Sequence, residues 1–330
     1  MKPFHTDLTS DALDDEQIGH EHADLGLPPV GTGLFARGEH LILPIAMWAV
    51  IMLLAATSIY LAGRLFLPNN FAGGLRAIVA TFYDPMFWRA AVVGLLAQTI
   101  DGALGMAYGV TSTTVLLAAG ASPAVASASV HIAEVFTTGI SGFFHIKLGN
   151  VDKRLFLRLL LPGLLGAVTG AVVISSFDGN MLKPYISGYL LLMGIYIISK
   201  VFRKLTIRDQ EPRHVAKLAI FGGFVDAVGG GGWGPVVTST LVGTGHDPRI
   251  TIGSVNLAEF FLTFGSAIVF SVLVGSGPWP IVAGLVFGGL FAAPFAAFLC
   301  HKLHARTLLI LVGTLISLLS LYNLYRALWA

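Results

Sequence analysis

Long apolar segments separated by short polar or glycine-rich stretches dominate this chain. Some of these segments carry almost no charge and are long enough to cross a bilayer core of about 30 Å. Others keep polar positions, which is typical of spans that face protein or a water-filled cavity. The pattern predicts an all-α membrane protein with about 7–9 transmembrane segments. The predicted apolar spans are 41–63, 155–174, 185–202, 281–300 and 307–325, and the predicted polar spans are 126–146 and 250–275.

The second half of the chain repeats the first half with an offset of 125 residues. The repetition is strongest between 101–141 and 226–266, which align without a gap. We therefore expect repeat one to run from 90 to 205 and repeat two from 215 to 330. Duplicated apolar halves with paired glycines and carboxylates are typical of membrane transporters. The coincident pairs include Asp101/Asp226, Gly105/Gly230, Gly109/Gly234, Thr113/Thr238, Ser129/Ser254, Glu134/Glu259 and, more weakly, Gly188/Gly313.

The composition adds to this prediction only by excluding other classes of protein. Mean hydropathy is +0.78, and only 12% of residues are charged, against roughly 25% in a soluble domain. The net charge of +2 gives no reason to expect a nucleic-acid partner. The single cysteine, Cys300, excludes an internal disulfide and a multi-cysteine metal site, and we expect no cofactor and no metal.

Residues 1–40 differ from the rest because they are polar. They carry eight acidic residues against Lys2 and Arg37, which predicts a solvated, disordered tail without a cleavable signal peptide. His20 and His22 alone do not make a metal site, because no further ligand is fixed nearby. We expect an extra transmembrane helix over 41–66, then a loop and an interfacial helix over 67–89. The interfacial helix is indicated by its aromatic residues, Phe82, Tyr83, Phe87 and Trp88.

Charge in the loops predicts the topology. The linker 206–214 lies in a basic stretch, and the loop 147–158 is also basic, so both should be cytoplasmic, as should the N-terminus. The counterpart of that loop in repeat two, 272–283, has no charged residue. This asymmetry predicts that repeat two is inverted in the membrane, with three full spans per repeat plus one glycine-rich segment that enters and turns back. We expect a multi-pass protein of the cell inner membrane.

Each repeat contains a break in an apolar segment. The run Asp226-Ala-Val-Gly-Gly-Gly-Gly-Trp-Gly-Pro235 cannot continue as a helix, since glycine costs about 1 kcal/mol and proline about 3 kcal/mol relative to alanine. Repeat one has a milder version between Asp101 and Gly109. Broken helices expose N–H groups and a positive dipole end, and glycine lets a ligand approach the backbone closely.

We therefore predict an anion site between the two breaks, at the membrane midplane. The alternative is that the glycines only permit close helix packing, which we favour for Gly163, Gly166 and Gly170. The predicted substrate-binding residues are Gly105, Gly109, Thr111, Ser112, Thr113, Ser129, His131, Gly230, Gly231, Gly232, Trp233, Thr238, Ser254 and Asn256.

Four carboxylates, Asp101, Glu134, Asp226 and Glu259, lie in apolar surroundings. A carboxylate there is costly unless it is protonated, paired or hydrogen-bonded. All four are candidates for proton or cation coupling, which we favour for the glutamates. For the aspartates we favour a hydrogen bond to the glycine-loop backbone that holds the break open. The spacing of three places His131 and Glu134 on one helix face, and His131 is either a titrating group or a structural histidine.

Several of these motifs together resemble one family. Two glycine-rich breaks, each followed by a proline and a Ser-Val-(His/Asn)-x-Ala-Glu helix, with Gly149-Asn-Val-Asp152 in the first copy, are similar to the TauE/SafE family of sulfite exporter-like permeases, also called the toluene sulfonate uptake permeases. The resemblance covers about 90–330. It implies an inner-membrane permease for small sulfur-containing anions such as sulfite, sulfoacetate or related sulfonates. Many members have Gly-Gly-Gly in the first repeat also, whereas Leu104–Gly109 here differs, so the half-sites should be unequal.

The predicted function is a secondary permease that exports such an anion by alternating access. Export is favoured because an inside-negative potential expels an anion by about 2.3 kcal/mol per charge per 100 mV. Two alternatives stay open: a channel-like anion pore, and a proton- or cation-coupled carrier of a non-sulfur organic acid. The sequence offers no nucleophile–base pair for an enzyme. The expected partners are the small anion and the lipid bilayer, and a homo-oligomer is compatible with the sequence.

Overall fold

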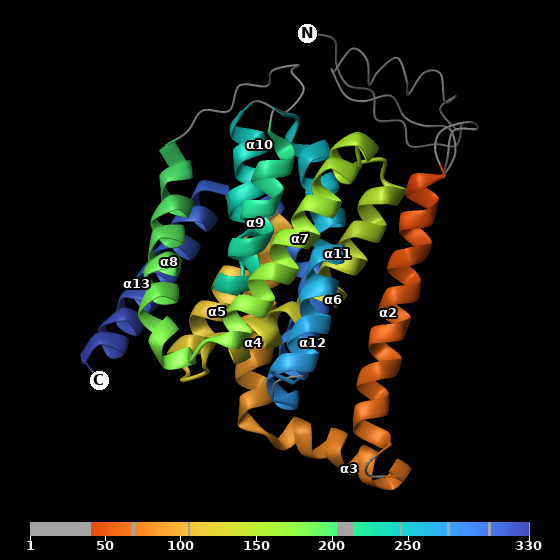
Figure 1. Ribbon diagram of the computed structural model, residues 1–330, viewed down its shortest axis with the longest axis vertical. Helices are drawn as coiled ribbons and strands as arrows, with labels where there is room; N and C mark the ends of the chain where they lie inside the picture. Colours follow the sequence, from red (N-terminus) through yellow and green to blue (C-terminus); the bar gives the residue numbers. More distant parts are fainter. Residues whose placement is uncertain are drawn as a thin grey trace. The chain divides into compact units, whose positions relative to one another are not determined.

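The structure is a computed structural model that describes residues 41–67, 70–104, 106–202, 214–244, 246–275, 278–302 and 305–329. The acidic segment 1–40, most of the linker 206–214 and Gly105 lie outside the described residues. The contacts set 42–330 apart as one compact unit, and within its described part the regular structure is helical, without a strand (Figure 1). This confirms the prediction of an all-α fold.

The helices follow the predicted spans closely. Five of them, α2, α7, α8, α11 and α13, are long and apolar enough among the described residues to cross a membrane. The described elements are α2 (Ile42–Phe66), α3 (Asn70–Tyr83), α4 (Pro85–Leu104), α5 (Tyr108–Ala118), α6 (Pro123–Lys147), α7 (Lys153–Ser176), α8 (Gly179–Ser199), the 3₁₀ turn η1 (Lys200–Phe202), α9 (Val215–Gly229), the π-helical turn η2 (Gly234–Thr238), α10 (Ser239–Gly243), α11 (Pro248–Leu273), α12 (Trp279–Lys302) and α13 (Ala305–Trp329).

The start of a helix is fixed in the same way in both repeats. Ser122 caps α6, where its Oγ accepts the Val125 N–H at 3.4 Å, and a proline follows at the first position. Asp247, the equivalent of Ser122, caps α11 and accepts the Ile250 N–H at 3.1 Å, again before a proline. Such a cap stabilises a helix by about 1 kcal/mol, and proline tolerates the first position because no donor is lost there.

Helix α4 begins at Pro85, within the segment 67–89 for which a loop and an interfacial helix were predicted. Helix α3 ends at Tyr83, and α4 already begins at Pro85, where the Asp84 carboxylate accepts the Met86 N–H at 2.8 Å. Phe87 is therefore part of α4 and is only 2% exposed, packed among Phe82, Trp88 and Phe287. It contributes to the core instead of to an interfacial surface.

Both glycine-rich segments interrupt a helix, as predicted. Helix α9 ends at Gly229, and Gly230 and Gly231 have φ angles of 68° and 142°, which side chains rarely adopt. In repeat one the interruption lies between Leu104 and Tyr108, where α4 ends and α5 begins. In Figure 1, α4 leaves α3 at the lower end of the bundle, whereas α9 lies at its upper end.

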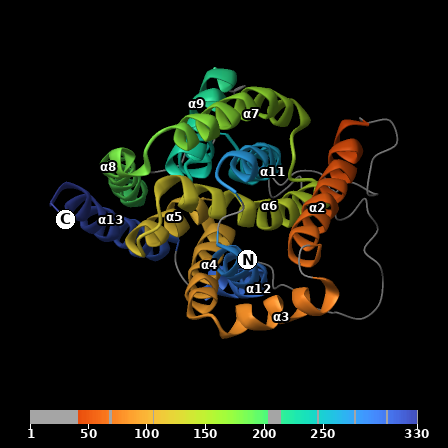
Figure 2. The same cartoon turned by 60° about the horizontal axis from the view of Figure 1, so that its bottom comes forward.

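Helices of the two repeats interlock. Helix α4 packs against α12, and α9, the equivalent of α4, packs against α7, the equivalent of α12. The equivalent helices α6 and α11 also pack together and run antiparallel, because Gly142 faces Leu257 while Gly139 faces Phe260. Helices α8 and α13 pack in the same antiparallel way. Figure 2 shows α8 beside α13, and α6 beside α11.

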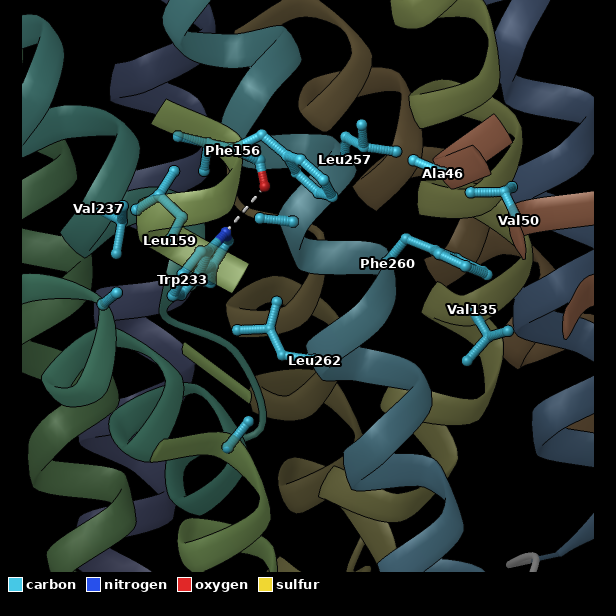
Figure 3. Close-up of a cluster of buried hydrophobic side chains, with 14 of the residues drawn as sticks. Ala46, Val50, Val135, Phe156, Leu159, Trp233, Val237, Leu257, Phe260 and Leu262 are labelled. Carbon is cyan, nitrogen blue, oxygen red and sulfur yellow. Dashed lines mark hydrogen bonds between the residues drawn. The ribbon is translucent and has the colours of Figure 1, made fainter. Parts of the chain in front are cut away.

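Small residues make these crossings close. A side chain on Gly166 would overlap the backbone of α9, since its Cβ would lie 2.9 Å from the Ile220 carbonyl carbon. At Gly170 a Cβ would overlap the Phe224 backbone, and at Gly163 it would lie 2.8 Å from the Trp233 ring. These contacts support the packing interpretation for the three glycines. The core beside them holds buried Trp233, with Leu159 and other apolar residues around it (Figure 3).

Many large apolar side chains point away from the bundle. Leu161 and Leu165 on α7 are each 66% exposed, and Leu192 on α8 is 64% exposed. Such a surface suits lipid, which is as apolar as these side chains.

Candidate functional site

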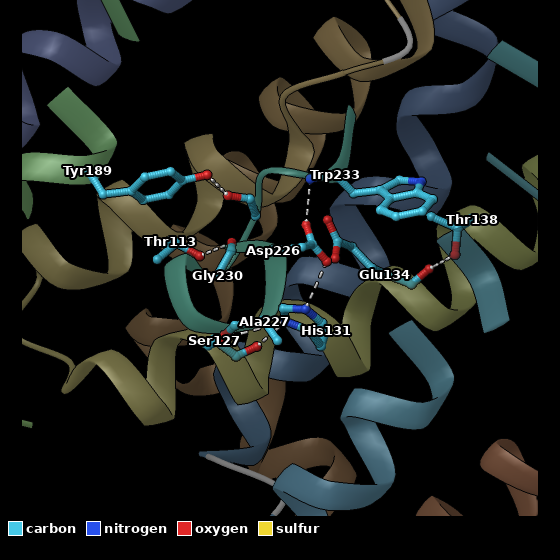
Figure 4. A network of polar contacts seen from close by, with 11 residues as sticks. Thr113, Ser127, His131, Glu134, Thr138, Tyr189, Asp226, Ala227, Gly230 and Trp233 are labelled. Carbon is cyan, nitrogen blue, oxygen red and sulfur yellow. Dashed lines mark hydrogen bonds and ion pairs between the residues drawn. The ribbon is translucent and has the colours of Figure 1, made fainter. Parts of the chain in front are cut away.

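The two glycine breaks touch each other. A Cβ on Gly109, in the first turn of α5, would lie 2.6 Å from the Gly231 Cα and 3.0 Å from the Gly230 carbonyl oxygen. The Thr113 hydroxyl donates to that same carbonyl, so α5 is tied to the second break (Figure 4). Segments more than a hundred residues apart in the sequence therefore form one structure at the centre of the bundle.

Asp101 and Asp226 hold the two breaks in equivalent ways. The Asp226 Oδ1 accepts the Trp233 N–H at 2.9 Å, and the Asp101 Oδ1 accepts the Tyr108 N–H at 3.3 Å. Each carboxylate thus bonds the backbone seven residues further along, on the far side of the break. These are the hydrogen bonds expected from the structural interpretation of the two aspartates, since a carboxylate acceptor makes a strong bond in an apolar setting. Their coupling role stays a prediction.

His131 pairs with the carboxylate of the other repeat. It is fully buried on α6, and its Nε2 lies 3.2 Å from the Asp226 Oδ2. Its Nδ1 lies 2.8 Å from the Ser127 carbonyl oxygen, which only accepts, so Nδ1 carries a hydrogen. The contact between Nε2 and Asp226 then needs one further proton, on the imidazole or on the carboxyl. His131 therefore bonds α9 and does not pair with Glu134, although both lie on α6.

Glu134 lies where the breaks meet. It is 3% exposed, and a Cβ on Gly109 would lie 2.9 Å from its Oε1. Its Oε2 has no hydrogen-bond partner within the described part of the chain. The Thr138 hydroxyl donates to the Glu134 backbone carbonyl at 2.6 Å and not to the carboxyl group. Glu134 is thus a buried ionisable group that points into the junction of the two repeats.

A small cavity lies at this junction. Its volume is about 10 Å³, which is room for about one water molecule. A larger anion does not fit without movement of the breaks. The lining includes all four predicted carboxylates and residues of both breaks: Asp101, Ala107, Tyr108, Gly109, Val110, Glu134, Thr137, Thr138, Asp226, Gly231, Gly232, Gly234, Pro235 and Glu259.

Several predicted binding residues do not line this cavity but carry buried polar atoms. Thr111, Ser112 and Ser129 are buried, and their hydroxyls have no partner among the described residues. The amide oxygen of Asn256 is likewise without a partner there. Buried polar atoms of this kind are uncommon in proteins and are available to a ligand or to water.

Other predicted binding residues serve the scaffold. The Trp233 indole donates to the Val255 carbonyl at 3.1 Å and packs in the core, so only its backbone reaches the break. Ser254 lies away from the cavity, where its hydroxyl accepts the Asp152 N–H at 2.8 Å at the start of α7. Thr238 is buried in η2. Gly105 lies outside the described residues.

Two residues near the breaks were not predicted from the sequence. The Tyr189 hydroxyl on α8 donates to the Gly231 carbonyl at 2.9 Å, and a Cβ on Gly229 would overlap the Tyr189 ring. Lys200, at the end of α8, contacts the Ser239 hydroxyl at the start of α10 and lies 2.8 Å from the Met106 sulfur, so it links the first break to α10. The sequence could have indicated Lys200 as a site residue, because it is a lysine at the end of an apolar run. Nothing in the sequence around Tyr189 indicates such a role.

Comparison with known proteins gives concordant results. The family model described as "Sulfite exporter TauE/SafE" matches residues 90–323. The chain is similar to the "Probable membrane transporter protein YtnM" of Bacillus subtilis (strain 168), with 46% identity over 240 residues, 70% of this chain and 80% of that protein. It is also similar to the "Probable membrane transporter protein YunE" of the same organism, with 21% identity over 267 residues, 72% of this chain and 97% of that protein. No solved structure matches the chain.

Proposed function

The chain belongs to the sulfite exporter TauE/SafE family of membrane transporters, and on this premise we propose that it is a secondary permease that exports a small sulfur-containing anion. It is a multi-pass membrane protein and not an enzyme. The candidate substrates are sulfite, sulfoacetate and related sulfonates. The single observation that carries the proposal is the contact of the two glycine breaks at Gly109 and Gly231.

An inverted arrangement of the repeats fits the packing. Two copies in the same orientation would place equivalent helices parallel, yet α6 and α11 pack antiparallel, and so do α8 and α13. The uncharged segment 272–283 opposite the basic loop 147–158 supports the same inference. Inverted repeats give a carrier two related half-structures that can exchange their conformations around one site.

The chemistry of the junction suits an oxyanion that travels with protons. The glycine backbone of the lining supplies donors, and the lining includes no lysine side chain. The hydroxyls of Thr111, Ser112 and Ser129, which do not line the cavity, have no partner among the described residues and are further donors. Four carboxyl groups line the same cavity, and an ionised carboxylate would repel the substrate. We infer that Glu134 and Glu259 are neutral when the anion is bound, so that protons and anion share the site.

The size of the cavity supports alternating access. A space of about 10 Å³ holds one water molecule but no sulfite ion, so binding needs the breaks to separate. The contact between Gly109 and Gly231 closes the site in this conformation. A continuous pore is less consistent with this closure. The four carboxyl groups keep a proton- or cation-coupled carrier of an organic acid as the second candidate.

Flux into proteoliposomes tests the proposal. The purified full chain is reconstituted, and sulfite, sulfoacetate, taurine and acetate are compared as labelled substrates. We expect saturable flux of sulfite or sulfoacetate, and acceleration of labelled uptake by unlabelled anion trapped inside, because a carrier with one site exchanges its ligand faster than it returns empty. Flux of acetate alone would favour the organic-acid carrier, and flux that neither saturates nor shows counterflow would favour a channel.

A further inference from the structure

A second cavity, of about 350 Å³, lies at the far end of α5. Two cationic side chains, Lys183 and Arg326, line it together with three neutral polar ones. Gly120, whose φ is 100° and at which an added Cβ would meet no atom within 4 Å, leaves its mouth open. The polar lining consists of Asn180, Lys183, Ser187, Asn323 and Arg326.

Helix α5 connects this cavity with the central site. It begins at the first break with Tyr108 and ends at Ala118, two residues before Gly120, and its 11 residues span roughly 16 Å. The Asn323 side chain, from the cavity wall, donates to the Thr114 carbonyl of α5 at 3.1 Å. The ends of α5, α8 and α13 lie beside one another here (Figure 2). The cavity is at the end of α6 opposite the basic loop 147–158.

The repeat shows that this polar lining is not required by the scaffold. The offset of 125 residues carries Asn180, Lys183 and Ser187 to Ala305, Leu308 and Val312. It carries Asn323 and Arg326 to Ile198 and Val201. Every polar group of the lining therefore has an apolar residue at the equivalent position of the other repeat. The two cations of the lining, Lys183 and Arg326, therefore have no charged residue at their equivalent positions, Leu308 and Val201.

The local charge balance is positive. Lys183 is half-buried and Arg326 stacks near Tyr322, with 5.9 Å between the guanidinium carbon and the ring centre. The nearby acid is Asp178, which caps α8 and accepts the Asn180 N–H at 2.9 Å. Two cations against one capped carboxylate leave an excess positive charge. Cations are disfavoured on the non-cytoplasmic side of a membrane protein, where the proposed topology places this end.

We propose that this cavity is an anion vestibule, in which a small oxyanion exchanges between bulk water and the central site. The proposal rests on the proposed function as an anion permease. Lys183 and Arg326 supply charge, and Asn180, Ser187 and Asn323 supply hydrogen-bond donors. In an exporter, this cavity is where the anion is released from the protein. Helix α5, with its hydroxyl residues 111–114, forms one wall of the path between the central site and the cavity.

Charge-selective labelling tests the vestibule without requiring transport. Asn180→Cys is introduced into the full chain with Cys300→Ser and placed in nanodiscs of a zwitterionic lipid. The rates of modification by an anionic sulfonatoethyl and a cationic trimethylammonioethyl methanethiosulfonate are compared. We expect the anionic reagent to react faster than the cationic one. The double substitution Lys183→Gln with Arg326→Gln should lower the ratio of the anionic to the cationic rate at least about tenfold. Two unit charges about 6 Å from the thiol have an effect of this order in water.

A matched pair controls for the general charge of this face. Arg64→Gln with Arg76→Gln removes two cations from α2 and α3, at the same end of the bundle but outside the cavity (Figure 1). We expect this pair to change the ratio less than about twofold, since exposed charges beyond about 10 Å are screened. An equal effect of both pairs, or no effect of Lys183→Gln with Arg326→Gln, would overturn the proposal.

Protection identifies the source of the anion. Inorganic sulfate added in zwitterionic nanodiscs should slow labelling of Asn180→Cys by the anionic reagent. Slower labelling that needs an anionic lipid in the disc, with no effect of sulfate, would assign the cavity to a lipid headgroup and overturn its role as a vestibule. Labelling does not require flux. Charge-selective labelling together with an absence of flux in proteoliposomes would therefore contradict the proposed substrate and still support the anion site.

Discussion

Asp101 and Asp226 have the same backbone role but different side-chain partners. Both accept the N–H of an aromatic residue across a glycine break, Tyr108 or Trp233. Asp226 also meets His131 of the other repeat, whereas the residue equivalent to His131 is Asn256, which does not titrate. The contact between a histidine and the carboxylate therefore belongs to one break only. The predicted inequality of the half-sites thus extends to the groups that can carry a proton.

Sequence spacing found these residues but not their neighbours. The motifs identified all four carboxylates that line the cavity, because a charge in an apolar run is conspicuous. The spacing of three placed His131 beside Glu134 on one helix face, yet it could not specify that α9 would bring Asp226 to the imidazole. Ser254 differs from its repeat equivalent Ser129, because its hydroxyl accepts the Asp152 N–H in the turn before α7.

Glu134 is the residue at which proton coupling is most directly tested. An ionised Glu134 repels a bound anion, and its ionised fraction grows as pH rises, so wild-type flux should fall with rising pH. Glu134→Gln keeps the size and removes the charge. We expect the variant to lose this pH dependence and, at high pH, to have an apparent KM at least about tenfold below that of wild type. The substrate is a sulfonate whose own charge is constant around neutral pH.

Asp84→Asn is the control for this experiment, because Asp84 caps α4 away from the cavity. It should leave the stability nearly unchanged, because asparagine caps a helix about as well as aspartate, and it should leave the pH profile of flux as in wild type. A Glu134→Gln protein with the wild-type pH profile would return Glu134 to a structural role.

At the scale of elements, the breaks could be predicted and the helix partners could not. Four consecutive glycines end α9 at Gly229 because of their backbone entropy. The predicted spans match α2, α6, α7, α8, α11, α12 and α13, with ends that differ by at most six residues. The start of α4 was missed because Pro85 was interpreted as part of a loop, although proline is also favoured in the first turn of a helix. The pairing of α4 with α12 has no local signal.

The close crossing of α7 and α9 gives a prediction with a matched control. A Cβ at Gly166 would lie 2.9 Å from the Ile220 carbonyl carbon and 3.0 Å from the Phe224 nitrogen, whereas at Gly188, on α8, it meets no atom within 4 Å. Gly166→Ala should therefore destabilise the protein by about 1–3 kcal/mol. Gly188→Ala should be neutral or stabilise by up to about 1 kcal/mol, since alanine is the better helix former.

Thermal unfolding in detergent compares the two variants with wild type. A lower midpoint for Gly166→Ala alone is the expected result. Equal midpoints for the two alanine variants would mean that α7 and α9 do not approach as closely as described.

At the scale of the whole molecule, each repeat packs its first helix against a helix of the other repeat. Because α4 packs on α12 and α9 on α7, neither repeat buries its first helix within itself. The second break is also completed by repeat one, through Thr113 at Gly230 and His131 at Asp226. The duplication predicted two equivalent halves, but not this interlocking, which depends on long-range packing. Helices α2 and α3 lie before the region that the family model matches, 90–323.

The junction of the two breaks is tested most directly by counterflow of labelled sulfite in proteoliposomes, with wild type, Gly231→Ala and Gly149→Ala. Both glycines have positive φ, 142° and 67°, but a Cβ on Gly231 would lie 2.6 Å from the Gly109 Cα, whereas one on Gly149 meets nothing within 4 Å. We predict counterflow in wild type and Gly149→Ala, and at least about a tenfold loss in Gly231→Ala, as the junction cannot close. Absence of sulfite counterflow in wild type, or wild-type counterflow in a folded Gly231→Ala protein, would contradict a carrier built on this junction.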